Sequence, residues 1–199
     1  KISKKVFTRE EVGLPKDSFV FCCFCQNYKI KPNIFDIWMK VLKKIDGSVL
    51  WLIKDSNEGA NNLKKEAENR GVNPDKIIFA ENMPISEHLA RHKMADLFID
   101  TFPYTAHTTC SDALWSGLPV ITLMGQSFAS RLSGTLLNAV GLNELIATTE
   151  KDYEDLIINL AKDSNQLKII KNKLEKNKIN QPIFNTKLYT KKIESAYKE

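Results

Sequence analysis

Five short apolar runs, none with alternating polar positions, constrain the fold of this 199-residue chain more than any other feature. A strand with one exposed face alternates apolar and polar residues, whereas a strand covered on both faces reads as a continuous apolar run. Single helical segments separate the runs, and such short connections require parallel strands joined by right-handed crossovers. The predicted fold class is therefore α/β, a Rossmann-like, doubly wound parallel sheet, with strands at 19–24, 48–53, 76–80, 95–99 and 118–123.

Helix signals lie between these runs and dominate the rest of the chain. Pro32 stands where a proline opens a helix, and apolar residues follow it at helical spacing as far as Ile45. Further helices are predicted at 61–70, 84–93, 108–115, 130–140, 151–163, 164–177 and 186–197, and a short last strand at 144–147. We expect a lead-in segment over 1–18, a domain over 19–180, and a closing segment over 181–199 whose helix packs back on the domain edge.

The stretch 100–119 follows the fourth predicted strand and leads into a helix. Pro103 prevents the strand from continuing, and the small and hydroxylated residues at 105–109 suit the start of a helix, which Gly117 and Pro119 then end. Open α/β sheets bind their ligands beyond the carboxyl ends of the strands, where helix amides face an anion. A helix cap without a ligand is the alternative explanation of the threonines. The candidate binding residues here are His107, Thr108, Thr109 and Asp112.

The loop after the first strand contains no glycine, whereas a dinucleotide-binding loop carries a glycine-rich fingerprint. The Walker A sequence is absent as well, which argues against NAD and against P-loop nucleotidases. Gln26 and Lys29 lie in this loop, at the same carboxyl edge of the sheet as 107–109. An ammonium facing a helix N-terminus would hold a diphosphate, with Lys29 neutralising charge on a leaving phosphate. A surface lysine is the alternative interpretation of Lys29.

His88 and Arg91 lie three residues apart on one face of the helix predicted at 84–93. Near the crevice such a pair could read a base, because Arg91 offers donors to carbonyl oxygens and His88 offers a ring for stacking. His92 falls on a different face, and we expect it at the surface. Asp112, one helical turn beyond Thr108, could accept hydrogen bonds from ribose hydroxyls.

Charge, acidic residues and cysteines give no sign of a nucleic-acid, metal or membrane site. The net charge of +5 comes largely from lysines, which after residue 160 are interspersed with apolar positions, as on a solvated helix face. No Asp-X-Asp pair follows a strand, so we expect no metal on a diphosphate. Cys22, Cys23, Cys25 and Cys110 lack zinc-site spacing and do not suggest a disulfide framework. The sequence shows no signal peptide and no long apolar stretch, so we expect these cysteines to be buried thiols in a cytoplasmic protein.

From residue 19 to 197 the chain closely resembles the carboxyl-terminal half of the catalytic region of O-GlcNAc transferases. These are GT-B glycosyltransferases of the family 41 type, which attach N-acetylglucosamine to Ser or Thr of intracellular proteins. The most specific similarity lies in 100–115, in the Gly-Leu-Pro-Val-Ile-Thr that follows at 117–122, and in Ala-Ser-Arg at 129–131. Segments 26–29, 84–91 and 182–190 support it. The resemblance implies the nucleotide-binding lobe of such an enzyme, with a UDP-sugar site.

The resemblance also implies roles for individual residues. The matching positions are Gln26 and Lys29 near the diphosphate, with Lys29 as the catalytic residue, His107, Thr108 and Thr109 on the phosphates, Asp112 on the ribose, His88 and Arg91 at the uracil, and the Met83 backbone on the base edge. Animal enzymes of the family have a lysine where this chain has Ile85. One ribose contact is therefore missing or supplied differently.

For the whole enzyme, the resemblance implies UDP-GlcNAc as donor, a protein as acceptor, and no cofactor or metal. The family's tetratricopeptide repeats and first catalytic lobe, which includes a histidine close to the acceptor, have no counterpart in these residues. We therefore expect one lobe of a two-lobe enzyme, inactive alone. Two alternatives stay open: a GT-B lobe that uses a fucose or hexose donor, as in a plant and bacterial branch with similar motifs, and a nucleotide-sugar-binding module without activity.

Overall fold

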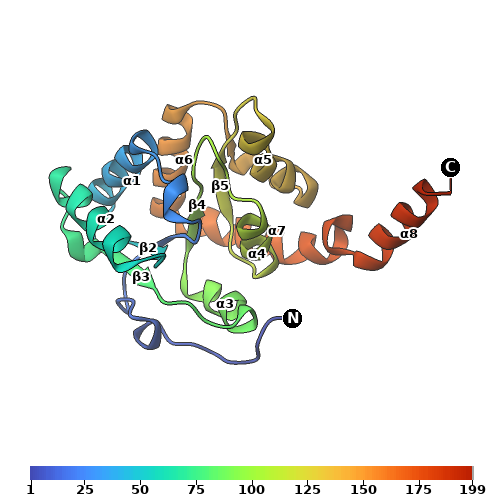
Figure 1. The fold of residues 1–199 in the computed structure, drawn as a ribbon, viewed down its shortest axis with the longest axis horizontal. Coiled ribbons are helices and arrows are strands. Elements are labelled where there is room, and N and C mark those ends of the chain that lie inside the picture. The colour runs from blue at the N-terminus through green and yellow to red at the C-terminus, as the bar shows by residue number, and fades with distance from the viewer. Residues whose placement is uncertain (199) are drawn as a thin grey trace.

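Six parallel strands form one sheet in the computed structural model, which describes residues 1–198. Their order across the sheet is β3-β2-β1-β4-β5-β6, and helices lie on both sides of it (Figure 1). This confirms the predicted doubly wound α/β class, and all six predicted strands are present. The strands are β1 (Val20–Cys23), β2 (Val49–Ile53), β3 (Ile77–Ala80), β4 (Leu97–Ile99), β5 (Val120–Leu123) and β6 (Ile146–Ala147).

The direction of the strand order reverses between β1 and β4. From β1 the chain proceeds through β2 to β3 on one side, and from β4 through β5 to β6 on the other. Phe21 of β1 lies in register with Leu50 of β2 and with Leu97 of β4. In such sheets a ligand binds outside the carboxyl ends of the strands at the reversal. The loops that follow β1 and β4 are therefore the segments from which a site can be built.

The helices begin and end where local chemistry allows. Ser56 and Ser127 accept hydrogen bonds from backbone amides at the starts of α2 and α5, so both helices begin earlier than predicted. Gly117, at a φ of +84°, follows the end of α4, where a side chain would be strained. The helices are α1 (Pro32–Lys44), α2 (Asn57–Asn69), α3 (Ile85–Arg91), α4 (Thr108–Trp115), α5 (Phe128–Val140), α6 (Glu150–Lys162), α7 (Ser164–Asn180) and α8 (Thr186–Ala196).

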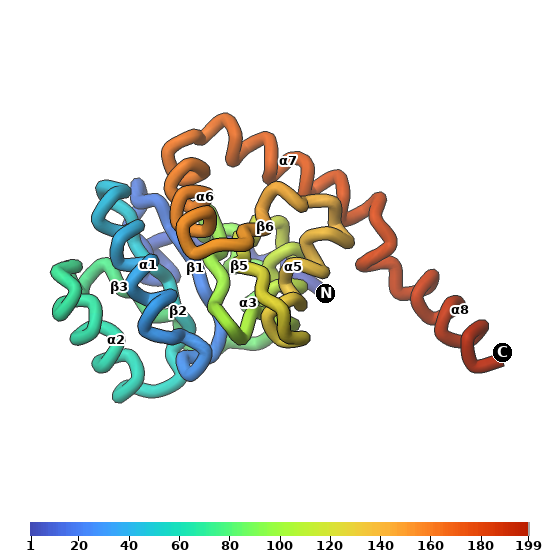
Figure 2. The backbone as a smooth tube through the Cα atoms, turned by 90° about the horizontal axis from the view of Figure 1, so that it is seen from above, coloured from blue at the N-terminus to red at the C-terminus, as the bar shows by residue number. Residues whose placement is uncertain are grey.

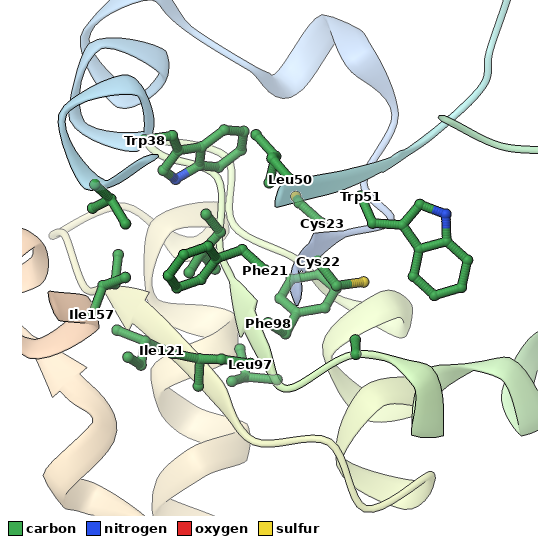
Figure 3. Packing of buried hydrophobic residues seen from close by; sticks show 14 of the residues in the cluster. Phe21, Cys22, Cys23, Trp38, Leu50, Trp51, Leu97, Phe98, Ile121 and Ile157 are labelled. Carbon is green, nitrogen blue, oxygen red and sulfur yellow. The ribbon is translucent and has the colours of Figure 1, made fainter. Parts of the chain in front are cut away.

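Fully buried side chains cover both faces of the central strands. Phe21 and Leu50 lie in register on neighbouring strands, on the side of the sheet where α1 places Trp38 (Figure 3). The next pair in the register, Cys22 and Trp51, lies on the opposite side. All five side chains are 0% exposed. Coverage on both faces is the reason that these strands read as continuous apolar runs.

The lead-in segment is tied to the starts of two central strands. Phe7 and Leu14 are buried, and Nη2 of Arg9 lies 2.8 Å from a carboxylate oxygen of Asp96. The same oxygen accepts a hydrogen bond from the backbone amide of Val20 at 2.9 Å. This ion pair therefore joins residues 1–18 to β1 and to the segment that precedes β4.

The last helix does not pack as predicted. α8 has no buried residue and projects away from the rest of the molecule (Figure 1, Figure 2). The prediction that it packs back on the domain edge is therefore wrong. The segment just before it makes the apolar contact instead, because the ring of Phe184 lies 5.2 Å from that of Trp115. Beyond this point Tyr189 and Tyr197 are 66% and 84% exposed.

The cysteines agree with the sequence analysis. Cys22, Cys23, Cys25 and Cys110 are all unpaired and buried. Three of them lie in β1 or just after it, so they occupy the centre of the sheet. Among residues 1–198, no helix is both long enough and apolar enough to cross a membrane.

Replacing Tyr153 of α6 with phenylalanine is expected to destabilise the fold. Its buried hydroxyl donates to the carbonyl oxygen of Asp100 at 2.7 Å and accepts from Nε1 of Trp38 at 3.2 Å. Removing the hydroxyl leaves both groups without this partner in the interior, at a cost of about 1 to 3 kcal/mol. Urea unfolding measures the loss, with the exposed Tyr189→Phe as control. Equal stability of the two variants would contradict this prediction.

Candidate functional site

Three segments meet at the carboxyl edge of the sheet, beside the reversal between β1 and β4. They are the loop after β1 with its short 3-10 helix (Asn27–Lys29), the segment 101–106 after β4, which we call the strap, and the first turn of α4. Together they surround an open pocket of about 430 Å³. The pocket is lined by Phe24, Cys25, Gln26, Tyr28, Lys29, Tyr104, His107, Thr108 and Thr109.

Lys29 brings positive charge to this pocket. The residue is 9% exposed, and its Nζ donates to the carbonyl oxygen of Thr105 at 3.3 Å. Nζ also lies 3.8 Å from the ring centroid of Tyr104. Within residues 1–198, no carboxylate forms an ion pair with Lys29. Because a buried charge is costly when it is unpaired, an anion in the pocket would stabilise this ammonium.

The N-terminus of α4 offers the second feature that favours an anion. Its cap position is His107, and no side chain accepts a hydrogen bond from the first turn. The first amides of a helix have no partner within the helix, so those of Thr108 and Thr109 are available to a ligand. The Thr109 hydroxyl lies 3.5 Å from Sγ of Cys25 and does not cap the helix. The helix dipole adds a preference for negative charge.

Asp100 anchors the strap from inside the sheet. Its carboxylate is fully buried, and Oδ1 accepts from the amides of Thr101 at 2.8 Å and of Ala106 at 2.7 Å. Oδ2 accepts from the Thr122 hydroxyl at 2.7 Å. Burial raises the pKa of Asp100 above its ordinary value, and these hydrogen bonds oppose that rise. This role was not predicted, although a carboxylate directly after a continuous apolar strand is a signal for it.

A second set of hydrogen bonds ties the strap to α5. Thr105 donates both its amide, at 3.2 Å, and its hydroxyl, at 2.6 Å, to the carbonyl oxygen of Ala129. The Ser133 hydroxyl donates to the carbonyl oxygen of Ala106. The backbone that leads into α4 is therefore held from two sides, by the sheet and by α5. Such support fixes the direction of the α4 amides without a ligand.

Cys25 differs from the other cysteines because it lines the pocket. Its pKa lies below the ordinary value, chiefly through a hydrogen bond with Cys23 and to a lesser extent with Thr109. Burial instead raises the pKa of Cys22, Cys23 and Cys110. This distinction among the four thiols was not predicted from the sequence. The difference has a local cause, since the Cys25 thiol, just beyond the end of β1, meets the Cys23 thiol and the Thr109 hydroxyl.

His88 and Arg91 of α3 both lie against the ring of Phe24, a residue that lines the pocket. Nη2 of Arg91 donates to Nδ1 of His88 at 2.6 Å, and Nη1 donates to the carbonyl oxygen of Glu81 at 2.6 Å. Arg91 is 1% exposed, and its guanidinium carbon lies 4.8 Å from the centroid of the Phe24 ring. Arg91 therefore contacts protein groups and does not line the open pocket. Its direct contact with a base stays a prediction.

Burial keeps His88 and His92 neutral. Desolvation, with a smaller contribution from the charge of Arg91, lowers the pKa of His88 to about 4. The pKa of His92 falls to about 3, again chiefly through desolvation. His92 is 1% exposed and shares a hydrogen bond of 2.8 Å between its Nδ1 and the carbonyl oxygen of His88. The prediction of a surface position for His92 is wrong, because α3 ends at Arg91 and a 3-10 turn redirects the chain.

The predicted site residues thus fall into two groups. Five of them surround one pocket: Gln26, Lys29, His107, Thr108 and Thr109. The other four do not line this pocket, and their contacts with a ligand stay predictions: Met83, His88, Arg91 and Asp112. Asp112 is half-buried one turn into α4, and its burial raises its pKa. Ile85, the first residue of α3, is 64% exposed.

The doubly wound sheet, with an anion-favouring pocket at its reversal, defines a Rossmann-like lobe of the kind found in GT-B glycosyltransferases. The sequence profile described as glycosyl transferase family 41 matches residues 2–193. The chain belongs to this family, which confirms the resemblance predicted from the sequence.

Curated relatives and a solved structure agree with this assignment. A probable UDP-N-acetylglucosamine–peptide N-acetylglucosaminyltransferase of Arabidopsis thaliana is 36% identical over 95% of this chain and 19% of its own length. The corresponding enzyme of Caenorhabditis elegans is 34% identical over 94% of this chain and 16% of its own length. A mutant O-GlcNAc transferase of Thermobaculum terrenum superposes with a TM-score of 0.84 at 31% identity, over 89% of this chain and 35% of its own. The chain therefore spans under a fifth of these two curated relatives.

The free energy of unfolding is expected to fall as the pH is lowered from 6.5 towards about 4. In this window His88 and His92 take up protons in the unfolded chain but remain neutral in the folded protein. The unfolded state then binds more protons, so acid favours unfolding. Urea unfolding at about pH 7, 5.5 and 4.5 measures the slope, which His92→Asn should reduce. An unchanged slope in this variant would contradict the assignment to His92.

Proposed function

We propose that this chain is the donor-binding lobe of a protein O-GlcNAc transferase. The complete enzyme would transfer N-acetylglucosamine from UDP-GlcNAc to Ser or Thr hydroxyls of proteins. One observation carries the proposal: within residues 1–198 the buried Lys29 ammonium has no carboxylate partner, and it lines the same pocket as the uncapped N-terminus of α4. The relatives at 34% and 36% identity, named as peptide N-acetylglucosaminyltransferases, support the choice of donor and acceptor.

The chemistry assigned to this pocket is the departure of UDP. In the transfer, the bond between the anomeric carbon and the phosphate oxygen breaks, and UDP leaves with the bonding electron pair. The acceptor hydroxyl oxygen forms the new bond to that carbon, and its proton is released to water. Lys29 is the catalytic residue, because it stabilises the charge that develops on the leaving phosphate. The ammonium and the helix amides neutralise the diphosphate, so we propose that no metal or other cofactor takes part.

We assign the nucleoside to the α3 side of the pocket. The His88 ring lies 5.0 Å from that of Phe24, and this aromatic surface suits the uracil. The Met83 backbone and Arg91 are proposed at the base edge, and Asp112 at the ribose. Ile85 is uncharged and cannot make the ribose contact that the resemblance assigns to a lysine in the animal enzymes. The ribose contact of this protein is therefore proposed to depend on Asp112.

The acceptor and the cellular setting concern the whole enzyme. The chain covers 19% and 16% of the length of the relatives named above. We propose that acceptor binding belongs to an upstream lobe and to tetratricopeptide repeats outside these 199 residues. Four buried, unpaired cysteines support a reducing, cytoplasmic location.

UDP is expected to bind this chain equally well with and without EDTA, and more tightly than GDP. Calorimetric titration with UDP, GDP and UDP-GlcNAc measures the affinities. Lys29→Met should weaken UDP binding by about tenfold, equal to about 1.4 kcal/mol. A loss of UDP affinity of about tenfold on adding EDTA would contradict a metal-free site. Tighter binding of GDP would favour the lobe of an enzyme with another donor.

The isolated chain is expected to bind UDP-GlcNAc without glycosylating a peptide. Transfer needs the acceptor hydroxyl held against the anomeric carbon, and such positioning can contribute about 7 to 11 kcal/mol. Mass spectrometry of a Ser/Thr peptide incubated with the donor detects transfer. The control joins the chain to the upstream lobe of a relative, which should restore activity. Robust transfer by the isolated chain would contradict the one-lobe proposal, and no transfer by the joined protein would favour a binding module.

A further inference from the structure

The ring of Tyr104 covers the ammonium of Lys29. The ring centroid lies 3.8 Å from Nζ, within the range of a cation–π interaction. The hydrogen bond from Nζ goes to the carbonyl oxygen of Thr105, the next residue of the strap. Two neighbouring groups of the strap, an aromatic face and a carbonyl oxygen, therefore hold a cation that has no carboxylate partner within residues 1–198.

The position of Tyr104 is itself set by the fold. Its carbonyl oxygen accepts a hydrogen bond from the Thr101 hydroxyl at 2.7 Å, and its ring lies 4.9 Å from that of His107. The ring of Tyr28 is 6.4 Å from it. Tyr104 is 39% exposed, so part of the ring faces solvent at the pocket. The ring thus contacts the Lys29 ammonium and lies near His107, the residue that precedes α4. Hydrogen bonds that do not involve Lys29 anchor its strap.

We propose that Tyr104 is a positioning residue that holds the Lys29 ammonium in the pocket before a diphosphate binds. The inference rests on the proposed function, because it requires Lys29 to contact the donor phosphates. A free lysine side chain samples many rotamers, and fixing it in advance removes that cost from the binding step.

An aromatic ring suits this task better than a carboxylate. A carboxylate at the same place would also hold Lys29, but it would neutralise the ammonium and repel the incoming phosphates. The ring attracts the cation through its electron-rich face and carries no net charge. Lys29 is thereby fixed while its full positive charge remains for the ligand.

A double-mutant cycle tests this role. UDP affinity is measured by calorimetry for the unmodified chain, Tyr104→Leu, Lys29→Met and the double variant. Tyr104→Leu should weaken UDP binding about fivefold, whereas Tyr104→Phe, which keeps the ring, should stay within about twofold. In the Lys29→Met background, Tyr104→Leu should have no effect, because it acts through Lys29. Tyr189→Leu, at a tyrosine 66% exposed on α8, is the matched control.

Uridine gives a second readout, because it lacks the phosphates. Tyr104→Leu should leave the affinity for uridine unchanged, whereas a general disturbance of the pocket would weaken uridine and UDP alike. Loss of uridine binding, or an equal loss of UDP affinity with and without Lys29, would overturn the inference. So would a Tyr104→Leu variant that binds UDP normally while Lys29→Met does not. If Lys29→Met binds UDP as tightly as the unmodified chain, the proposed phosphate site is wrong, and the proposed role of Tyr104 is wrong with it.

Discussion

The buried carboxylate of Asp100 is the interaction on which the pocket depends. Asp100 follows the end of β4, and its carboxylate accepts hydrogen bonds from the amides of Thr101 and Ala106 at the two ends of the strap. Its backbone carbonyl oxygen accepts a hydrogen bond from the hydroxyl of Tyr153 in α6. A buried charge of this kind persists when hydrogen bonds replace the lost water. The amide of Ala106 is bound to Asp100 and holds the backbone that enters α4. No side chain caps the amides at the start of α4, so these amides can bind a ligand.

Most of the fold could be predicted because its signals are local. A run such as Val20–Cys23 is apolar at every position, since both faces of β1 are covered, and single helices between such runs dictate parallel pairing. The predicted starts of α2 and α5 were too late, because Ser56 and Ser127 can be recognised as caps only when the backbone is known. The placement of α8 could not be predicted, because an amphipathic pattern does not specify which surface, if any, the helix contacts.

The site was predictable where topology alone decides. Lys29 and the start of α4 meet because the carboxyl ends of neighbouring parallel strands share one edge of the sheet. The orientation of side chains was not predictable to the same degree. Arg91 turns towards Glu81 and His92 turns inward because α3 stops after Arg91. The contact of Tyr104 with Lys29 joins residues distant in the sequence, and no periodic pattern reports such a pair.

These contacts form a hierarchy that separates stability from binding. The sheet, α5 and α6 hold the strap through Asp100, Thr105 and Tyr153, and none of these hydrogen bonds involves the Lys29 ammonium. The strap then holds Lys29 through a ring and a carbonyl oxygen, which are weak partners for a cation compared with a carboxylate. The fold can therefore tolerate an uncompensated charge at Lys29, since the hydrogen bonds that anchor the strap involve other groups. An anion that enters the pocket meets a cation whose position is already set and whose charge is still free.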